Sequence, residues 1–364
     1  MAKKIAFTVS NDLTFDQRMI RICTSLQNAG YDCTLIGRKR KSSVKIESTS
    51  YQTKRLNLFF EKGKLFYLEL NFRLFIHLLF SKYDAYCAID CDTALASLMA
   101  KKLKGVPFVF DAHEIFAHTP EVKDRRRIQK IWLWVEKMSF AKSKFSYTVG
   151  AELAKHFEHC YSHKVSVIRN TPIPVSIPPS KIPQEKYILY QGALNKGRGL
   201  ENAILAMKEI PLKLKIAGEG DLSDELRSLV VKNGLEQKVV FLGFVKPHKL
   251  PELSRNAWLG LNVSENFGLS YYLSLNNKLF DYMHAELPSL INPFPEYIAI
   301  NRQFEIGVLT KSSVSDIVTN VNLLLGNEAK YDLLKSNCKK AKDVFNWLQE
   351  EKELVRLYKE NIGE

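Results

Sequence analysis

The sequence predicts an α/β fold made of two doubly wound domains that face each other across a cleft. Two observations support this prediction. Short apolar runs alternate with helical patterns along the chain, and a proline-rich stretch at 171–184 interrupts that alternation. Alternating strands and helices build parallel sheets covered by helices. The length of 364 residues, of which 46% are hydrophobic and 25% charged, suits two such domains.

The first series of elements fills residues 1–170. An apolar run at 4–9 predicts a strand, and the helical pattern after it ends at Gly30, where a glycine suits a helix C-terminus. This order of strand, helix, glycine and strand is that of a βαβ unit. Further strands are predicted at 33–36, 86–89, 107–110, 146–149 and 165–168, with a helix over 93–102.

The second series is separated from the first by prolines. Five of them fall between Pro172 and Pro183, a density that neither a helix interior nor a central strand tolerates, so 171–184 is predicted as a stiff linker. A second domain is then predicted over 185–344, and the chain is expected to be helical beyond residue 292. Its strands are predicted at 187–191, 213–217, 239–242, 259–263 and 289–292, and its helices at 200–210, 223–233, 250–256 and 278–285.

The net charge lies almost entirely in the first domain. Residues 1–170 hold 29 Lys and Arg against 16 Asp and Glu, whereas the remainder holds 24 against 23. Such an excess indicates a negatively charged partner, which could be an anionic membrane surface, a nucleic acid or an acidic substrate. Nucleic acid is disfavoured because no recognition motif accompanies the basic residues.

Two stretches of the first domain interleave aromatic, apolar and basic residues. Residues 54–83 are predicted to form an amphipathic helix that lies on an anionic membrane surface, and residues 123–138 add a second basic-aromatic stretch. The alternative is that these apolar faces belong to the protein core, which is the usual fate of an amphipathic helix.

Several classes of protein are disfavoured. No segment approaches the ~18 apolar residues that a membrane span needs, and the N-terminal residues do not resemble a signal peptide. The six scattered cysteines form no CxxC pair and are interpreted as reduced, buried thiols, as expected in the cytoplasm. His156, His159, Cys160 and His163 share one helical face, but a single helix rarely closes a tetrahedral zinc site, so no metal is expected.

A glycine-rich segment, GALNKGRG at 192–199, leaves a predicted strand and enters a predicted helix. Glycines let the backbone approach a ligand, a helix N-terminus offers free N–H groups, and Lys196 and Arg198 add two cations. The segment is not a P-loop, because Arg198 and Gly199 stand where Lys and Ser or Thr should follow. We therefore predict a diphosphate site here, although an ordinary glycine-rich turn with solvated charges is the alternative.

Two further strand ends are informative. Residues 111–114, DAHE, follow the strand predicted at 107–110, and loops beyond the carboxyl ends of parallel strands are where ligands bind. His113, flanked by two carboxylates, is therefore a candidate functional group. Residues 217–221, AGEGD, lack the third glycine of a dinucleotide fingerprint, which disfavours a Rossmann dehydrogenase.

Several segments, in this order, resemble the family 4 glycosyltransferases. The resemblance covers nearly the whole chain, and each motif is modest alone while the ordered set is specific. The segments are DQR at 16–18, DAHE at 111–114, IRN at 168–170, QGALNKGRGL at 191–200, AGEGD at 217–221, VFLGF at 240–244 and NKLFDYM at 277–283.

The resemblance implies a GT-B fold, in which 1–170 binds the acceptor and 185–344 holds the nucleotide-sugar donor. It also implies retention at the anomeric carbon, no cofactor and no required metal, and a last helix, about 345–364, that packs back on the first domain. The expected partners are a UDP- or GDP-sugar and a glycan or lipid-linked acceptor in surface polysaccharide or lipopolysaccharide synthesis. The expected location is the cytoplasmic face of a membrane.

The resemblance also assigns roles to individual residues. Without a metal, a leaving diphosphate must be stabilised by cations and helix dipoles, and an ionised carboxylate can accept two hydrogen bonds from a ribose. The implied set is His113 as the catalytic residue, Gly192, Lys196, Arg198 and Lys278 at the diphosphate, Asp281 at the ribose, Phe244 and Val245 at the base, and Asp16, Arg18 and Glu114 at the acceptor.

The sequence departs from the family pattern in the second domain. The family usually carries two Glu separated by seven residues; Asp281 takes the second place, and the apolar Leu273 takes the first. Two other functions therefore stay open: a non-catalytic GT-B-like subunit that binds a sugar nucleotide or a partner enzyme, and a sugar-nucleotide epimerase.

Overall fold

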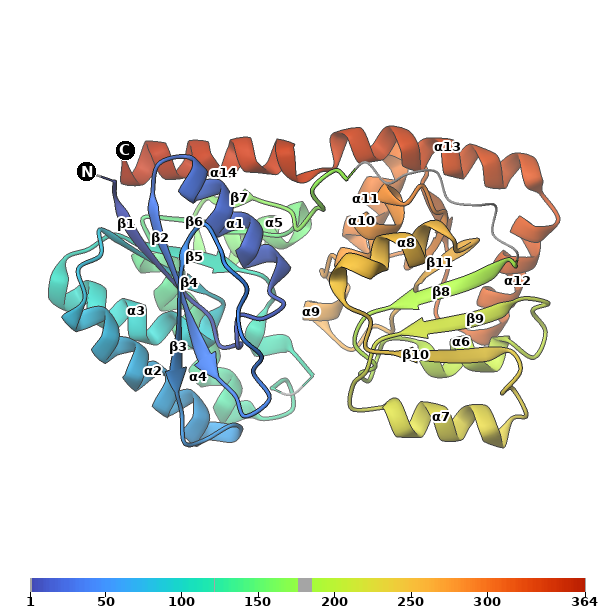
Figure 1. Ribbon diagram of the computed structural model, residues 1–364, viewed down its shortest axis with the longest axis horizontal. Coiled ribbons are helices and arrows are strands. Elements are labelled where there is room, and N and C mark those ends of the chain that lie inside the picture. Colours follow the sequence, from blue (N-terminus) through green and yellow to red (C-terminus); the bar gives the residue numbers. More distant parts are fainter. Residues whose placement is uncertain (1, 121, 176–184, 364) are drawn as a thin grey trace. The chain divides into compact units, whose positions relative to one another are not determined.

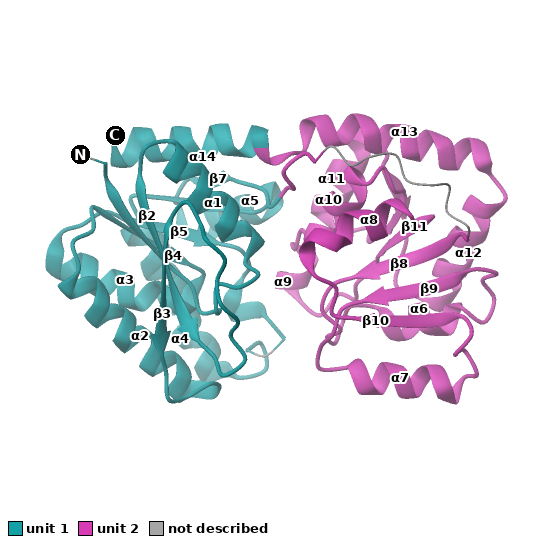
Figure 2. Ribbon diagram, viewed as in Figure 1, with its two compact units in different colours: residues 1–170, 348–364 teal, residues 171–347 magenta. Residues whose placement is uncertain are grey.

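The structure is a computed structural model that describes residues 2–120, 122–175 and 185–363. The chain forms two compact units, residues 1–170 with 348–364 and residues 171–347 (Figure 2). Each unit contains one parallel sheet with helices on both faces (Figure 1), so the predicted α/β class with two Rossmann-like domains is confirmed. Most of the predicted linker, including Pro178, Pro179 and Pro183, lies outside the described residues.

The sheet of the first unit has seven parallel strands in the order β3-β2-β1-β4-β5-β6-β7. The order reverses between β1 and β4, which is the place where open α/β sheets bind ligands. The strands are β1 (Lys4–Thr8), β2 (Asp32–Lys39), β3 (Gln52–Asn57), β4 (Ala85–Ile89), β5 (Phe108–Ala112), β6 (Phe145–Thr148) and β7 (Val165–Val167).

The helices of the first unit begin and end at recognisable residues. Helix α1 starts after Asp16, whose side chain accepts a hydrogen bond from the Met19 amide, and α3 ends at Gly105 in a left-handed conformation. The helices are α1 (Gln17–Asn28), α2 (Gly63–Phe80), α3 (Cys91–Lys104), η1 (Phe116–His118), α4 (Arg126–Lys142), α5 (Ala151–Tyr161) and the C-terminal α14 (Trp347–Ile362).

Helix α14 joins the first unit although it closes the sequence (Figure 2). Its buried Tyr358 contacts the aromatic rings of Phe7 and Phe145, at centroid distances of 6.2 and 5.1 Å. Glu350, on the same helix, accepts a hydrogen bond of 2.8 Å from the Arg169 amide. The burial of Tyr358 and the hydrogen bond between Arg169 and Glu350 together stabilise the packing of α14 on the first unit.

The second unit repeats the doubly wound plan with six parallel strands in the order β10-β9-β8-β11-β12-β13. Its strands are β8 (Tyr187–Gln191), β9 (Lys213–Ala217), β10 (Val239–Gly243), β11 (Leu259–Asn262), β12 (Ser289–Ile291) and β13 (Gly307–Leu309). Its helices are α6 (Leu200–Ala206), α7 (Ser223–Lys232), η2 (Pro247–Lys249), α8 (Leu250–Arg255), α9 (Leu269–Tyr272), α10 (Asn277–His284), α11 (Pro295–Phe304), α12 (Val314–Leu325) and α13 (Glu328–Val344).

Two predictions about elements were wrong. Residues 54–57 do not begin a helix; they form part of the edge strand β3, which pairs with β2 and is tied to the loop after β1 by the Arg55 guanidinium. Residues beyond 292 are not helical throughout, because β13 extends the second sheet. Both strands owe their place to pairing with residues distant in sequence, which local periodicity does not reveal.

Candidate functional site

Strand β5 ends in a buried ion pair. Asp111 is fully buried, and its carboxylate accepts hydrogen bonds of 2.9 and 3.2 Å from the Arg18 guanidinium. Arg18 projects from α1, is 4% exposed, and also donates to the Ile168 carbonyl at 2.8 Å. Burial alone would raise the pKa of Asp111, but the Arg18 and His113 cations lower it below its usual value.

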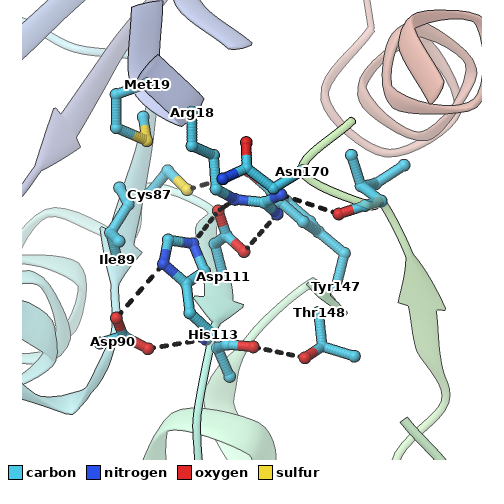
Figure 3. A network of polar contacts seen from close by, with 12 residues as sticks. Arg18, Met19, Cys87, Ile89, Asp90, Asp111, His113, Tyr147, Thr148 and Asn170 are labelled. Atoms are coloured by element: carbon cyan, nitrogen blue, oxygen red, sulfur yellow. Dashed lines mark hydrogen bonds and ion pairs between the residues drawn. The ribbon is translucent and has the colours of Figure 1, made fainter. Parts of the chain in front are cut away.

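The imidazole of His113 lies between two carboxylates (Figure 3). Its Nε2 is 2.9 Å from Asp111 Oδ2, and its Nδ1 is 3.4 Å from Asp90 Oδ2. When the ring is protonated, its Nε2 and the Asp111 carboxylate form an ion pair. Burial would lower the pKa of His113, but the two carboxylates outweigh burial and raise the pKa to about 9. The ring is therefore a cation at neutral pH, which does not suit a general base.

Asp90 is a site residue that sequence reasoning missed. It follows β4 directly, and its Oδ1 accepts a hydrogen bond of 2.7 Å from the His113 amide. Its backbone has a positive φ of 57°. One signal was available: β4 and β5 were both predicted, and an Asp that ends a strand beside the strand carrying His113 is placed to reach it.

The three residues predicted to bind the acceptor have different surroundings. Asp16 caps α1 and also accepts a 2.6 Å hydrogen bond from Asn11. Arg18 donates hydrogen bonds to the Asp111 carboxylate and to the Ile168 carbonyl, so its contacts in this structure stabilise the end of β5. Glu114 is exposed directly after His113. Acceptor binding by these three residues stays a prediction.

The glycine-rich segment of the second unit follows β8 and precedes α6, as expected. The backbone at two glycines lies too close to its neighbours for a side chain to fit. A Cβ at Gly218, which follows β9, would lie 1.9 Å from the carbonyl oxygen of Gly192 in the segment, and a Cβ at Gly197 would lie 2.7 Å from the Phe267 ring. An aromatic ring lies close to each of the two predicted cations. Lys196 Nζ lies 5.7 Å from the Phe267 centroid, and Arg198 Cζ lies 5.0 Å from the Tyr271 centroid.

Lys278 brings a third basic side chain to this segment from α10. The residue is 7% exposed, and its Nζ lies 3.8 Å from the centroid of Tyr190, beside Gly192. Burial, and then the neighbouring Arg198, lowers the pKa of Lys278 well below its usual value, although Asp281 acts in the opposite direction. A bound anion would relieve this unfavourable environment, so the group is well suited to phosphate.

Asp281 is held in place by a chain of hydrogen bonds. Its Oδ2 accepts from the Gln191 side-chain amide at 2.7 Å, and the Gln191 Oε1 accepts from the Ser254 hydroxyl at 2.9 Å. Gln191 is the last residue of β8, so the carboxylate is fixed next to the glycine-rich segment. A carboxylate fixed in this way can accept hydrogen bonds from a diol.

The residues predicted to contact a base follow β10. Phe244 is 59% exposed, whereas Val245 is partly buried against the cluster that includes Leu189 and Tyr282. Leu273, which stands where the family usually has a Glu, is buried at the end of α9. Position 273 therefore supplies no carboxylate to this site, unlike the Glu that the family usually has there.

Within the described ranges, no three His, Cys, Asp or Glu side chains are grouped so that they could hold a metal ion. His156 and Cys160 contact each other on α5, with the Sγ 3.7 Å from Nε2. All six cysteines are free, and only Cys160 is exposed. None of the helices in the described part of the chain has the length and apolar character to span a bilayer.

Two family models together match most of the chain. Residues 17–171 match the model described as Glycosyltransferase Family 4, and residues 175–341 match the model described as Glycosyl transferases group 1. These two matches follow the two compact units and agree with the resemblance seen in the motifs.

Two relatives are similar in sequence over part of their length. An uncharacterized glycosyltransferase of Methanocaldococcus jannaschii is 31% identical over 183 residues, which is 48% of this chain and 45% of that protein. The N-acetylgalactosamine-N,N'-diacetylbacillosaminyl-diphospho-undecaprenol 4-alpha-N-acetylgalactosaminyltransferase of Campylobacter jejuni is 44% identical over 63 residues, 17% of each chain. The chain thus matches less than half the length of either relative.

Solved structures share the fold over nearly the whole chain. Sucrose-phosphate synthase from Thermosynechococcus elongatus has a TM-score of 0.81 at 16% identity and covers 98% of both chains. HepE of Anabaena, in complex with UDP and glucose, has a TM-score of 0.77 at 14% identity and covers 98% of this chain and 100% of its own. At these identities the likeness establishes a common GT-B architecture.

Proposed function

We infer that this chain, which belongs to the family 4 glycosyltransferases, transfers a sugar from a nucleotide-sugar donor to a glycan or lipid-linked acceptor with retention of anomeric configuration. The observation that carries this proposal is the cluster in the second unit: the basic side chains of Lys196, Arg198 and Lys278 beside a glycine-rich turn, with the fixed carboxylate of Asp281. The cations match a diphosphate and the carboxylate matches a ribose.

The proposed reaction exchanges one bond at the anomeric carbon for another. The bond from this carbon to the diphosphate oxygen breaks, and the acceptor oxygen forms a bond on the same face of the sugar. The acceptor proton passes to the departing phosphate oxygen, so no protein base is required. Cations preorganised around the diphosphate stabilise the charge that develops as it leaves.

His113 is assigned an orienting role in this reaction. Its ring is cationic and faces carboxylates at both nitrogens, so it is a poor nucleophile and a poor base. We propose that the ring, fixed by these two carboxylates, contacts the donor sugar or the acceptor and orients it for transfer.

The relatives support the donor and acceptor classes. HepE was solved with UDP and glucose, and the Campylobacter relative is named for transfer onto a diphospho-undecaprenol lipid. We therefore propose a UDP-sugar as the first donor to examine, a GDP-sugar as the second, and a polyprenyl-linked glycan as the acceptor, in surface polysaccharide or lipopolysaccharide synthesis.

A membrane location on the cytoplasmic side is proposed from the outer face of α2. This helix is apolar on two sides: one stripe is buried in the unit, and a second stripe is exposed. Exposed apolar stripes are unusual and mark interaction surfaces. The exposed residues are Leu65, Leu68, Phe72, Ile76 and Phe80.

The neighbouring helices add to this surface. Helices α2 and α3 pack together, as do α3 and α4. Met99 and Leu103 on α3 and Ile131 and Trp134 on α4 are exposed as well. Basic residues accompany them, among them Lys102, Lys104, Arg126, Arg127 and Lys130. Apolar side chains that insert and cations that attract anionic lipids are the two components of interfacial binding.

A panel of nucleotide sugars tests the proposed function. The purified chain is incubated with UDP- and GDP-sugars and a polyprenyl-diphosphate-linked glycan, and release of nucleoside diphosphate is measured with and without the acceptor. The proposal expects acceptor-dependent release with one donor and a product of unchanged anomeric configuration. Tight donor binding with no release under any condition would instead favour the non-catalytic subunit.

A further inference from the structure

Asp90 has a conformation that helix capping does not explain. It precedes α3 at the N-cap position, where an Asp side chain ordinarily accepts a hydrogen bond from the first turn, but it makes no such bond. Its φ of 57° and ψ of 175° belong to a region that residues other than glycine rarely adopt. Glycine would suit this backbone and serine would cap the helix, yet neither would supply a carboxylate.

The carboxylate of Asp90 is directed to the end of the neighbouring strand instead. It accepts the His113 amide N–H at 2.7 Å through one oxygen and faces the ring Nδ1 at 3.4 Å through the other (Figure 3). Strands β4 and β5 pair in register up to this point, and the Asp90 amide donates to the Asp111 carbonyl at 2.8 Å. A single side chain thus contacts both the main chain and the ring of His113.

We propose that Asp90 is a positioning residue for His113: its carboxylate fixes the orientation of the imidazole and places a negative charge beside the ring Nδ1. The participation of this arrangement in sugar transfer rests on the proposed function, whereas the clamp itself does not. Asp111 and Asp90 hold the ring from opposite nitrogens, and strain at Asp90 is the structural consequence of turning its side chain away from α3.

The groups that face His113 come from four elements. Asp111 lies at the end of β5, Asp90 follows β4, Arg18 reaches in from α1, and Asp92 lies in the first turn of α3. Arg18 opposes protonation of the ring, but it is already paired with Asp111. Of the two carboxylates in contact with the ring nitrogens, Asp90 is the one whose removal leaves the Arg18–Asp111 pair intact while taking one negative charge from the ring.

The test is an NMR titration of the His113 imidazole in the wild type and in Asp90→Asn. The variant has the shape of the Asp90 side chain and keeps an oxygen for the His113 amide, but it loses the charge. We expect the His113 titration midpoint to fall by about one pH unit or more, as for loss of an opposite charge within contact distance. His113→Gln identifies the resonance by its disappearance.

Asp84→Asn is the matched control, since Asp84 is an exposed carboxylate just before the opposite end of β4. It should leave the His113 midpoint unchanged. In a transfer assay, Asp90→Asn should lower kcat with little change in the donor KM, and Asp84→Asn should change neither. Asp90→Gly, which suits the backbone, should show the same fall in midpoint if the Asn variant does not fold. An unchanged His113 midpoint in folded Asp90 variants overturns the proposal, whether or not transfer activity has been found.

Discussion

The Nε2 of His113 lies 2.9 Å from the Oδ2 of Asp111, a fully buried carboxylate that Arg18 also engages with two hydrogen bonds. Two cations therefore share one buried anion at the end of β5. The arrangement costs desolvation energy, and it persists because each charge has an opposite charge beside it. His113 is held as a cation by its surroundings before any substrate binds.

The first prediction concerns pH. The pKa of His113 is raised in the folded chain to about 9, above its ordinary value of 6.5. The stability contributed by this group is therefore fully present below pH 6.5 and is lost as the pH rises through about 9. We expect His113→Gln to have a lower melting temperature than the wild type at neutral pH, and the difference to shrink above pH 9, as measured by thermal denaturation across a pH series.

The control is His159→Gln, which replaces an exposed histidine of the same unit and should melt as the wild type does at every pH. A constant difference at every pH would contradict the assignment of His113 as a cation held between Asp111 and Asp90.

The second prediction concerns the diphosphate. Loss of the Arg198 guanidinium removes a charge-assisted contact, which should cost about 1.5–3 kcal/mol, or roughly tenfold to a hundredfold in affinity. Calorimetric titration of Arg198→Ala with UDP and with GDP measures this loss. Lys232→Ala, which removes an exposed cation at the end of α7, should bind as the wild type does. Equal affinities in all three proteins would remove Arg198 from the donor site.

The third prediction concerns the ribose. If the Asp281 carboxylate accepts hydrogen bonds from the ribose hydroxyls, the wild type should bind UDP more tightly than 2'-deoxy-UDP, by about tenfold. Asp281→Asn keeps the shape of the side chain, and it should lower UDP affinity and shrink the preference for the ribose form. The same preference in both proteins would show that Asp281 does not contact the 2'-hydroxyl, and loss of folding would assign it to the Gln191–Ser254 hydrogen bonds instead.

The elements that the sequence predicted well are those with local signals. The strand starting at Lys4 is a continuous apolar run, the helix ending before Gly30 has a capped pattern, and the turn at Gly192 combines a strand end with several glycines. Such features depend on residues close together in the chain. This is why the two doubly wound units and the glycine-rich turn could be predicted.

The features that escaped prediction depend on contacts between distant residues. Strand β3 follows no clear pattern and exists because β2 offers it an edge. The clamp on His113 requires that the end of β4 lie beside the end of β5, and the burial of Lys278 requires the Tyr190 ring. Charge and burial at a site are properties of the assembled sheet, so a motif can indicate where a site lies but not its electrostatics.

The fourth prediction concerns the membrane. We expect the chain to sediment with vesicles of phosphatidylglycerol more than with vesicles of phosphatidylcholine, and to be released in part by high salt, because each Lys or Arg near an anionic surface contributes about 1 kcal/mol. The double variant Leu68→Gln with Phe72→Gln should lose the salt-resistant part. Leu323→Gln, an exposed leucine of α12, is the control and should bind as the wild type does. Equal binding to both lipids, or binding to neither, would contradict the proposal that the positive charge of the first unit serves to bind an anionic membrane.

The central claim is that the chain moves a sugar from a nucleotide donor to an acceptor. The most direct measurement is the mass of a polyprenyl-diphosphate-linked glycan after incubation with each UDP- and GDP-sugar. The account predicts that one donor adds the mass of a single sugar residue with the wild type, and that Arg198→Ala and His113→Ala both reduce the yield strongly. Because His113→Ala should leave nucleotide affinity near that of the wild type, its effect separates transfer from binding. No mass increase with any donor, from a chain that binds the nucleotide, would contradict the account.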